Sequence, residues 1–313
     1  MRPSKNRKRS VGIFVSVWHD HPSAQRKQVQ GKVGSYTYPE FYWWGEPSFG
    51  IDRYTWRNTE MIDYHVNNWI TLGVDFIFLD FTNGTQEEIL QGADRLCARM
   101  AETGRGPRIV MWIRSVGDAK LFWDRYYKKY PKDLFFNHRG KPLLLIAGTT
   151  DGFPANSATP KPIPSGGILD NFTVRWMWAL MSDAGTMWKY KENSVTPKPY
   201  MFNGRPEQMG VTFAVQKTFM TTTNDGRRCR DDGKFFADQV RNMKKYNPDI
   251  VTIGSYNEWI SQQQNPTGGA PKFTDLWLPE CSADIEPMKG GFGAKYFNMA
   301  KDFIRSYAPG AYK

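Results

Sequence analysis

Two apolar runs of the sequence end in carboxylates. Residues 249–256 run straight into Asn-Glu-Trp at 257–259, and residues 76–81 carry Asp80 near their end. An ionised carboxylate beside buried chain costs several kcal/mol unless it is paired or solvated. We therefore predict that Glu258 and Asp80 face a solvated site, where one carboxylate can act as an acid and another as a nucleophile or base.

Other polar and aromatic residues follow further apolar runs. Trp18 and Asp20 follow the first run, Arg114 follows the run over 108–113, and Trp176 lies in a later one. Aromatic rings and hydrogen-bonding groups together suit sugar rings, which are half apolar and half polar. The predicted substrate-binding residues are Asn257, Trp259, Trp18, Asp20, Trp43, Trp44, Arg114 and Trp176.

Residues 36–50 form a loop rich in aromatic residues, Pro and Gly, and include Trp43 and Trp44. The rings could form a stacking platform, or they could pack beneath the loop and plug the barrel mouth. Glu40 and Glu46 add further acids to this stretch, and we take Glu46 as a third candidate catalytic residue.

The triplet His19-Asp20-His21 raises the alternative of a metal site. Side chains two apart on a strand point the same way, so both histidines could bind one zinc ion. No third group of ligands is evident among the 4 His of the chain, and we predict no metal. The sequence has no G-x-S-x-G, GxGxxG or P-loop motif, so we predict no cofactor either.

The elements that hold these residues alternate between strand and helix. Short apolar runs separated by helical spacing indicate a parallel sheet buried on both faces, either an open doubly wound sheet or a closed barrel. Because no nucleotide-binding motif follows the first strand, we predict a single-domain α/β protein, a (β/α)8 TIM barrel with long loop insertions at 149–169 and 186–209. The predicted strands are 11–18, 76–81, 108–113, 142–148, 172–180, 210–215 and 249–256, and the predicted helices are 56–72, one after a capping box at Thr85 and Glu88, 118–129, 234–246 and 293–307.

The chain of 313 residues carries a net charge of +11, and five of these charges lie within residues 1–10. We predict that 1–10 is a disordered basic tail and that 11–313 is the barrel domain. No RNA- or DNA-binding motif accompanies the basic run, so the sequence argues against a nucleic-acid partner. A binder of nucleic acid or another anionic polymer through this basic tail is the less favoured third alternative. The remaining positive charge hints at an acidic polysaccharide.

No apolar run is long enough for a transmembrane helix, and no apolar signal segment is present. We expect a secreted or cell-envelope protein if a signal has been removed, and a cytoplasmic one otherwise. Cys97 falls on the apolar side of a predicted helix and should be buried. Cys229 and Cys281 could pair, but the sequence does not decide this.

Three motifs resemble barrel hydrolases of glycoside hydrolase families 71 and 99. They are Asn-Glu-Trp at 257–259, Asp-Phe-Thr-Asn at 80–83 and Tyr-Pro-Glu-Phe-Tyr-Trp-Trp-Gly at 38–45. The resemblance implies a (β/α)8 barrel that hydrolyses glycosidic bonds in a polysaccharide or glycan without a metal. Trp259 beside Glu258 could favour the protonated acid by desolvation.

The chain departs from the family 99 pattern at one position. That pattern resembles Asn-Glu-Trp-x-Glu-Gly, and Ser261 stands where the second glutamate is expected. Either another carboxylate, such as Asp80, Glu46 or Asp20, takes the second role, or the protein is a catalytically inactive carbohydrate-binding barrel.

Overall fold

The structure is a computed structural model of the chain. It describes residues 1–3, 8–28, 40–148, 161–178, 186–215, 220–221, 229–264, 272–274 and 280–312.

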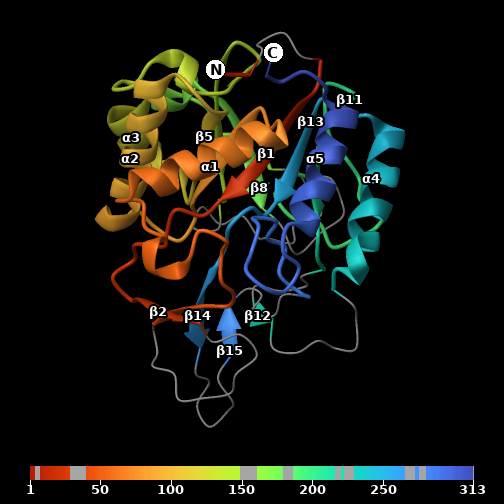
Figure 1. Ribbon diagram of the computed structural model, residues 1–313. Helices are drawn as coiled ribbons and strands as arrows, with labels where there is room; N and C mark the ends of the chain where they lie inside the picture. Colours follow the sequence, from red (N-terminus) through yellow and green to blue (C-terminus); the bar gives the residue numbers. More distant parts are fainter. Residues whose placement is uncertain are drawn as a thin grey trace.

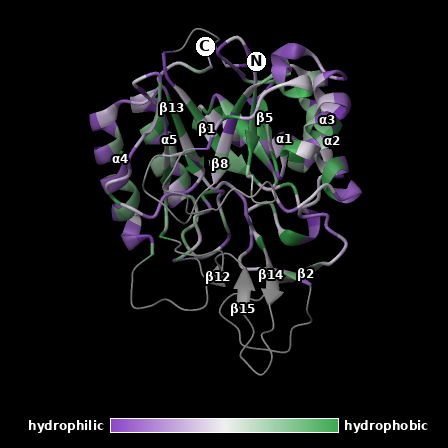
Figure 2. Cartoon of the chain, turned by 180° about the vertical axis from the view of Figure 1, so that it is seen from behind, coloured by the Kyte–Doolittle hydropathy of each residue, from purple (hydrophilic) through white to green (hydrophobic). Residues whose placement is uncertain are grey.

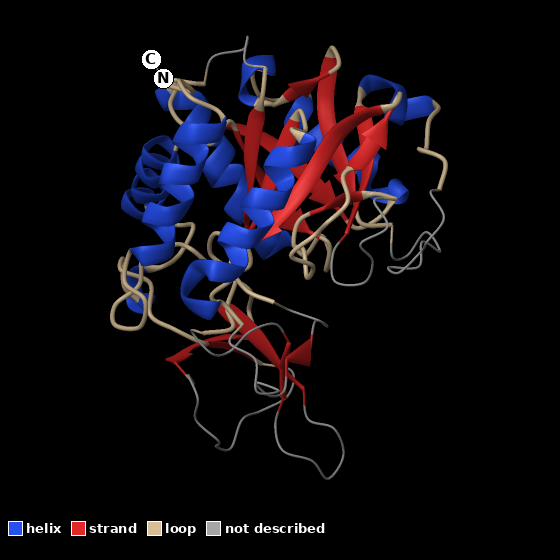
Figure 3. Ribbon diagram, turned by 90° about the vertical axis from the view of Figure 1, so that its right-hand side faces the viewer, coloured by secondary structure: helices blue, strands red, loops and turns tan. Residues whose placement is uncertain are grey.

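Within these residues, eight parallel strands form a nearly closed barrel (Figures 1 and 3). In chain order they are β1 Ser10–Val15, β4 Phe76–Phe81, β5 Arg108–Ile113, β7 Lys141–Ile146, β8 Thr173–Trp178, β9 Trp188–Lys189, β11 Arg205–Thr212 and β13 Ile250–Gly254. Their spatial order is β11-β13-β1-β4-β5-β7-β8-β9, with parallel pairing throughout. The predicted TIM-barrel fold class is thereby confirmed.

The barrel closes between β9 and β11 through side chains. The amide of Gln208 accepts from the Lys189 nitrogen (3.1 Å) and donates to the Lys189 carbonyl (2.8 Å). Thr252 of β13 donates to the same carbonyl (2.5 Å). Two glycines make room for this arrangement: a Cβ at Gly210 would lie 2.8 Å from the Lys189 oxygen, and one at Gly254 would lie 2.1 Å from the Tyr190 oxygen. Residues 189 and 190 therefore run against the inner face of the barrel.

Alternation along each strand separates two cores. The central strands are largely hydrophobic, and the helices around them carry many hydrophilic residues (Figure 2). One face of each strand packs under the helices, and the other fills the barrel interior. The interior cluster consists of Phe14, Phe76, Phe78, Val110, Trp112, Phe136, Leu143, Leu145, Ala147, Met177, Trp188, Tyr190 and Ile250. This filling makes the barrel a packed core, so any ligand site must lie at one of its two mouths.

Helices cover the outside of the barrel: α1 Thr59–Leu72, α2 Glu87–Thr103, α3 Ala119–Phe122, α4 Lys234–Tyr246 and α5 Lys295–Tyr307. A π-helix, Trp123–Tyr127, continues α3. Short 3-10 turns span Ile51–Arg53, Val116–Asp118, Lys132–Leu134, Gly167–Asn171 and Asp231–Gly233. The strands β6 Asn137–His138 and β10 Tyr200–Phe202 pair antiparallel with β7 and β11.

A second sheet lies beyond the carboxyl ends of the barrel strands (Figure 1). It contains β12 Met220–Thr221, β15 Lys272–Thr274, β14 Ile260–Gln264, β3 Phe41–Trp43 and β2 Ala24–Gln28, in that spatial order. β14 begins two residues after Glu258, and its Ile260 pairs with Trp43 of β3. The aromatic loop predicted over 36–50 thus supplies a strand next to the carboxylate motif.

Several boundaries differ from those predicted. The capping box at Thr85 and Glu88 is wrong, because α2 starts at Glu87 with Gln86 as a cap that makes no side-chain bond. The predicted insertion 186–209 is also wrong as a loop, since it holds β9, β10 and the start of β11. β9 escaped prediction because a strand of two residues carries no periodicity. Residues 149–160 of the other insertion lie outside the described residues.

The ends of the chain lie close together at the amino mouth of the barrel (Figure 1). Arg2 donates to the Met100 carbonyl (2.8 Å), and the Arg9 guanidinium lies 5.0 Å from the centre of the Tyr307 ring. Ser10 already belongs to β1. Residues 2, 9 and 10 of the basic segment therefore contact the barrel. Residues 4–7 lie outside the described residues. No helix among the described residues is long and apolar enough to cross a membrane.

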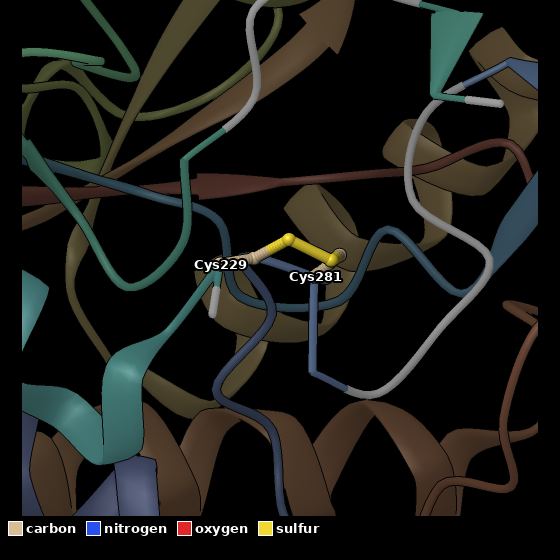
Figure 4. The surroundings of a disulfide bond; sticks show 2 residues. All are labelled: Cys229 and Cys281. Carbon is tan, nitrogen blue, oxygen red and sulfur yellow. A yellow bond between two sulfur atoms is a disulfide. The ribbon is translucent and has the colours of Figure 1, made fainter. Parts of the chain in front are cut away.

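Cys229 and Cys281 form a disulfide, with Cα atoms 4.7 Å apart (Figure 4). This answers the question that the sequence left open. The bond joins the segment before α4 to the segment that follows β15. In the sequence, Cys229 precedes β13 and Cys281 follows it. Cys97 is fully buried, as predicted.

Gln208 offers a test of barrel closure. Replacing Gln208 with Leu removes the acceptor for the Lys189 nitrogen and a donor to the Lys189 carbonyl in a buried setting. We expect the free energy of unfolding to fall by about 1–3 kcal/mol. Urea denaturation measures this, with Gln91→Leu on the outer surface of α2 as the control. Equal stability of the two variants would contradict the closure role of Gln208.

Candidate active site at the carboxyl mouth

Tyr190, directly after β9, forms the top of the packed barrel interior. Its ring lies 4.6 Å from the ring of Trp112, 5.7 Å from Phe14 and 6.1 Å from Trp178. Tyr190 is 6% exposed. These rings make an aromatic floor at the carboxyl ends of the strands, the face at which TIM barrels carry their active sites.

Lys191 follows Tyr190 and pairs with Glu258 above this floor. The Lys191 Nζ lies 2.8 Å from the Glu258 Oε2, and the side chains are 1% and 18% exposed, respectively. The ammonium is buried, while the carboxylate keeps partial access to solvent. A cation at this distance favours the ionised form of Glu258. Sequence analysis missed Lys191 because the residue follows a strand too short to predict.

The backbone of Glu258 is fixed from both sides. The Glu258 nitrogen donates to the Asp284 Oδ1 (2.6 Å), and the Glu258 carbonyl accepts from the Trp44 Nε1 (2.9 Å). The Asp284 carboxylate also accepts from Ser255 (2.5 Å) and Ser282 (2.9 Å). Asp284 is thus a buried brace for the loop that presents Glu258.

The predicted aromatic residues of the two motifs support this loop. Trp44 stacks on Trp259 with ring centres 4.6 Å apart, and the Trp43 ring lies 5.4 Å from that of His19. Trp43, Trp44 and Trp259 are all at most 1% exposed. The aromatic loop could form a stacking platform or pack beneath itself, and in this structure its rings pack beneath the loop. Direct stacking of these rings on a sugar stays a prediction.

Asn257 joins the end of β13 to β1 and to Tyr54. Its Oδ1 accepts from the Ser16 nitrogen (2.8 Å), and its Nδ2 donates to the Ser16 carbonyl (3.2 Å) and to the Tyr54 hydroxyl (3.1 Å). Asn257 is fully buried. Its side chain therefore positions the loop, and binding of a sugar hydroxyl by Asn257 stays a prediction.

Behind Asn257 lies a buried acid that the sequence did not single out. The Glu286 Oε2 accepts from Tyr54 (2.6 Å) and Trp259 (2.5 Å), and the Glu286 Oε1 lies 3.8 Å from the His65 Nδ1. Burial raises the pKa of Glu286 to about 8, against the opposing effect of its two donors. Burial likewise lowers the pKa of His65 to about 3, so both groups are mostly neutral near pH 7.

Asp80 lies on the interior face of β4, two residues beyond Phe78. It is the register neighbour of Trp112, whose ring belongs to the aromatic floor. Asp80 is 4% exposed, and its Oδ1 accepts from the Thr82 nitrogen (2.9 Å). Trp18 donates from its Nε1 to the Asp80 carbonyl (3.1 Å). The structure therefore brings Asp80 and Trp18 to the same mouth as Glu258.

The other predicted residues are more scattered. The Asp20 carboxylate accepts from the Trp56 nitrogen (3.0 Å). Glu46 pairs with Lys289 (2.7 Å) between partly exposed side chains. Arg114 follows β5 on the side of the strand that faces the barrel interior, at the carboxyl mouth. Its side chain is half-exposed, and its Nε lies 3.8 Å from the Asp118 Oδ2. Trp176 lies on the outer face of β8.

The outward placement of Trp176 corrects the expectation that it borders the mouth. Its indole donates to the Pro162 carbonyl (3.0 Å), and it packs in the cluster under the helices. Alternation along β8 explains this, because Met177 faces the interior instead. Trp178, which was not among the predicted site residues, contacts the floor, and its buried Nε1 has no hydrogen-bond partner among the described residues.

The two histidines considered as zinc ligands have other contacts. His19 is 1% exposed, with its Nε2 3.0 Å from the Asn257 carbonyl, and His21 accepts from the Ser23 nitrogen (3.1 Å). Over the described part of the chain, no group of three or more His, Cys, Asp or Glu side chains is arranged to hold a metal ion.

The fold and this mouth define a (β/α)8 barrel with a carboxylate–ammonium pair where barrel enzymes have their active sites. Among solved structures, the chain is similar to the family 99 endo-α-mannosidase from Bacteroides thetaiotaomicron, with a TM-score of 0.58 and 14% identity. The match covers 95% of this chain and 97% of that chain. The resemblance drawn from the motifs is thus confirmed for the fold. No family model and no curated protein matches the sequence.

The raised pKa of Glu286 predicts a pH-dependent stability. In the unfolded chain this carboxyl titrates near pH 4, at about 4.3. Between there and about pH 8 the unfolded state loses a proton that the folded state keeps, so the free energy of unfolding falls as the pH rises. We expect Glu286→Gln to gain stability over the wild type as the pH increases from 5 to 8, measured by urea denaturation. The exposed Glu102→Gln serves as control, and a constant difference between Glu286→Gln and wild type would contradict the prediction.

Proposed function

We propose that the protein is a glycoside hydrolase that cleaves a polysaccharide or glycan at the carboxyl mouth of the barrel. The observation that carries the proposal is the Lys191–Glu258 pair (2.8 Å), held above an aromatic floor. A fixed carboxylate, partly open to solvent and beside rings, is what glycosidic cleavage uses. The likeness in fold to a family 99 endo-α-mannosidase supports the same class of reaction.

The environments of the two acids suggest different roles. Glu258 lies beside an ammonium that favours its ionised form, which suits a nucleophile or general base. This differs from the role that Trp259 alone suggested, because Lys191 adds an opposite charge 2.8 Å from the carboxylate. Asp80 is more deeply buried and continues the apolar interior face of β4, which suits the general acid. In this proposal the partly exposed Arg114 donates to sugar hydroxyls.

An inactive carbohydrate-binding barrel is the second candidate, and Ser261 favours it. This residue stands in β14 at the place of the second glutamate in the family 99 pattern. It is 2% exposed, and its hydroxyl has no hydrogen-bond partner in the part of the chain that the structure describes. In this alternative the mouth binds glycan, while no acid is in place to protonate the leaving oxygen.

Reducing-end release from a polysaccharide panel, starting with α-mannans, separates the two candidates. For the hydrolase we expect Glu258→Gln and Asp80→Asn each to lower kcat by at least about 10³-fold, because each removes a group that acts in the transition state. Glycan binding by the variants should persist. Near-full activity of either variant would remove that residue from the mechanism. Binding without release by the wild type would establish the inactive barrel.

Lys191 offers a test of the ionisation of Glu258. Lys191→Met should lower kcat/KM and move the acid limb of its pH profile to higher pH, because the carboxylate loses the cation that favours its charged form. Lys189→Met is a matched control, since Lys189 is a buried lysine of the same segment that pairs with Glu192 instead (2.7 Å). An equal shift in both variants would show that the effect is structural.

A further inference from the structure

A cavity lies at the amino mouth of the barrel, opposite the candidate active site. It measures about 360 Å³ and is bordered by the starts of β1, β4, β5 and β13 and by the β6–β7 hairpin. Phe136, whose ring stacks on that of Phe76 with centres 4.3 Å apart, is part of its lining. Its charged lining residues include Lys8, Asp75, Arg108, Asp133, His138 and Asp249.

Arg108 is the unusual member of this lining. It is 6% exposed, yet its guanidinium has no hydrogen bond or ion pair with any described residue. The guanidinium nitrogens keep some contact with solvent in the cavity. Burial and the charge of Arg2 lower the pKa of Arg108, whereas the charges of Asp75 and Asp133 raise it. The guanidinium therefore has no hydrogen-bond acceptor among the described residues, and it borders a cavity large enough to hold one.

The other charged groups of the cavity are mostly engaged elsewhere. His138 and Arg139 both contact the buried Glu207 at 2.9 Å. Asp133 pairs with Arg2 (3.3 Å), and the Asp75 Oδ2 accepts from the Val11 nitrogen (2.8 Å). The described basic residues of the amino-terminal segment thus border this mouth.

Two lining residues remain with side chains directed to no described partner. Lys8 is exposed at the cavity and adds a second positive charge. Asp249 contributes a carboxylate that can accept from hydroxyl groups but repels anions. A ligand suited to both carries an anionic group for Arg108 and Lys8, and hydroxyl groups for Asp249.

We propose that the amino mouth is a binding site for a phosphate group, held by the Arg108 guanidinium with Lys8 as a second cation. The planar fork of a guanidinium matches two oxygens of a phosphate, and a second cation adds to the attraction. The cavity has room for more than the phosphate, and Asp249 suits a hydroxylated remainder. A hexose phosphate therefore fits better than free phosphate.

Isothermal titration calorimetry of the full chain at constant ionic strength tests this site, with inorganic phosphate and glucose 6-phosphate as ligands and glucose as the blank. We expect both phosphates to bind, glucose 6-phosphate more tightly, and glucose to give no signal. Arg108→Met should weaken phosphate binding about 10- to 100-fold, the usual effect of losing a charge-assisted pair of hydrogen bonds. The exposed Arg205→Met, at the start of β11, should bind as the wild type does.

Arg108→Lys guards against a failure of Arg108→Met to fold. It keeps the charge but loses the fork, so its affinity for phosphate should lie between those of wild type and Arg108→Met. Equal affinities for both phosphates would assign the site to free phosphate. Absence of binding by the wild type, or binding unchanged in Arg108→Met and Arg108→Lys, would overturn the proposal. None of these readouts depends on glycosidase activity.

Discussion

The passage of residues 188–191 along the inner wall of the barrel is the constraint on which the rest of the structure depends. β9 is too short to close the barrel by a backbone ladder, so Gln208 and Thr252 bridge the gap with side-chain hydrogen bonds. Gly210 and Gly254 leave the space that this segment needs. Closure and site formation are therefore one event, because the same segment sets Tyr190 on the interior core and Lys191 against Glu258.

A layer of buried polar groups supports that pair from outside the barrel. Asp284 and Trp44 hold the backbone of Glu258, while Asn257 ties the same loop to β1. Most of these groups satisfy one another, which is what makes buried polar networks rigid and specific. The Cys229–Cys281 bond borders this layer, since Arg230 beside it donates to the Asp284 carbonyl at 2.9 Å. The geometry at Glu258 is thus fixed by contacts far along the sequence.

The two mouths of the barrel differ in chemistry. At the carboxyl mouth, a carboxylate paired with one lysine lies among aromatic rings, which suits neutral or hydroxylated ligands. At the amino mouth, a mostly buried arginine that makes no hydrogen bond with a described residue borders a cavity, which suits an oxyanion. The packed interior separates them, so a ligand at one mouth does not reach the other. The basic residues of segment 1–10 that the structure describes lie near the amino mouth.

The sequence by itself determined the fold class and the general place of the site. Strands β4 and β5 were predicted with their observed bounds, because five of the six residues in each run are apolar, as in a strand buried on both faces. The rule that the carboxyl ends of parallel strands carry the polar site residues predicted that Glu258 and Asp80 lie at one mouth. Tertiary structure alone decided the partner of Glu258, the burial of Trp44 and Trp259, the outward face of Trp176 and the disulfide. The physical reason is that local pattern sets the direction of a side chain within its own strand, whereas ion pairs, stacking and closure join segments whose separation in sequence carries no signal.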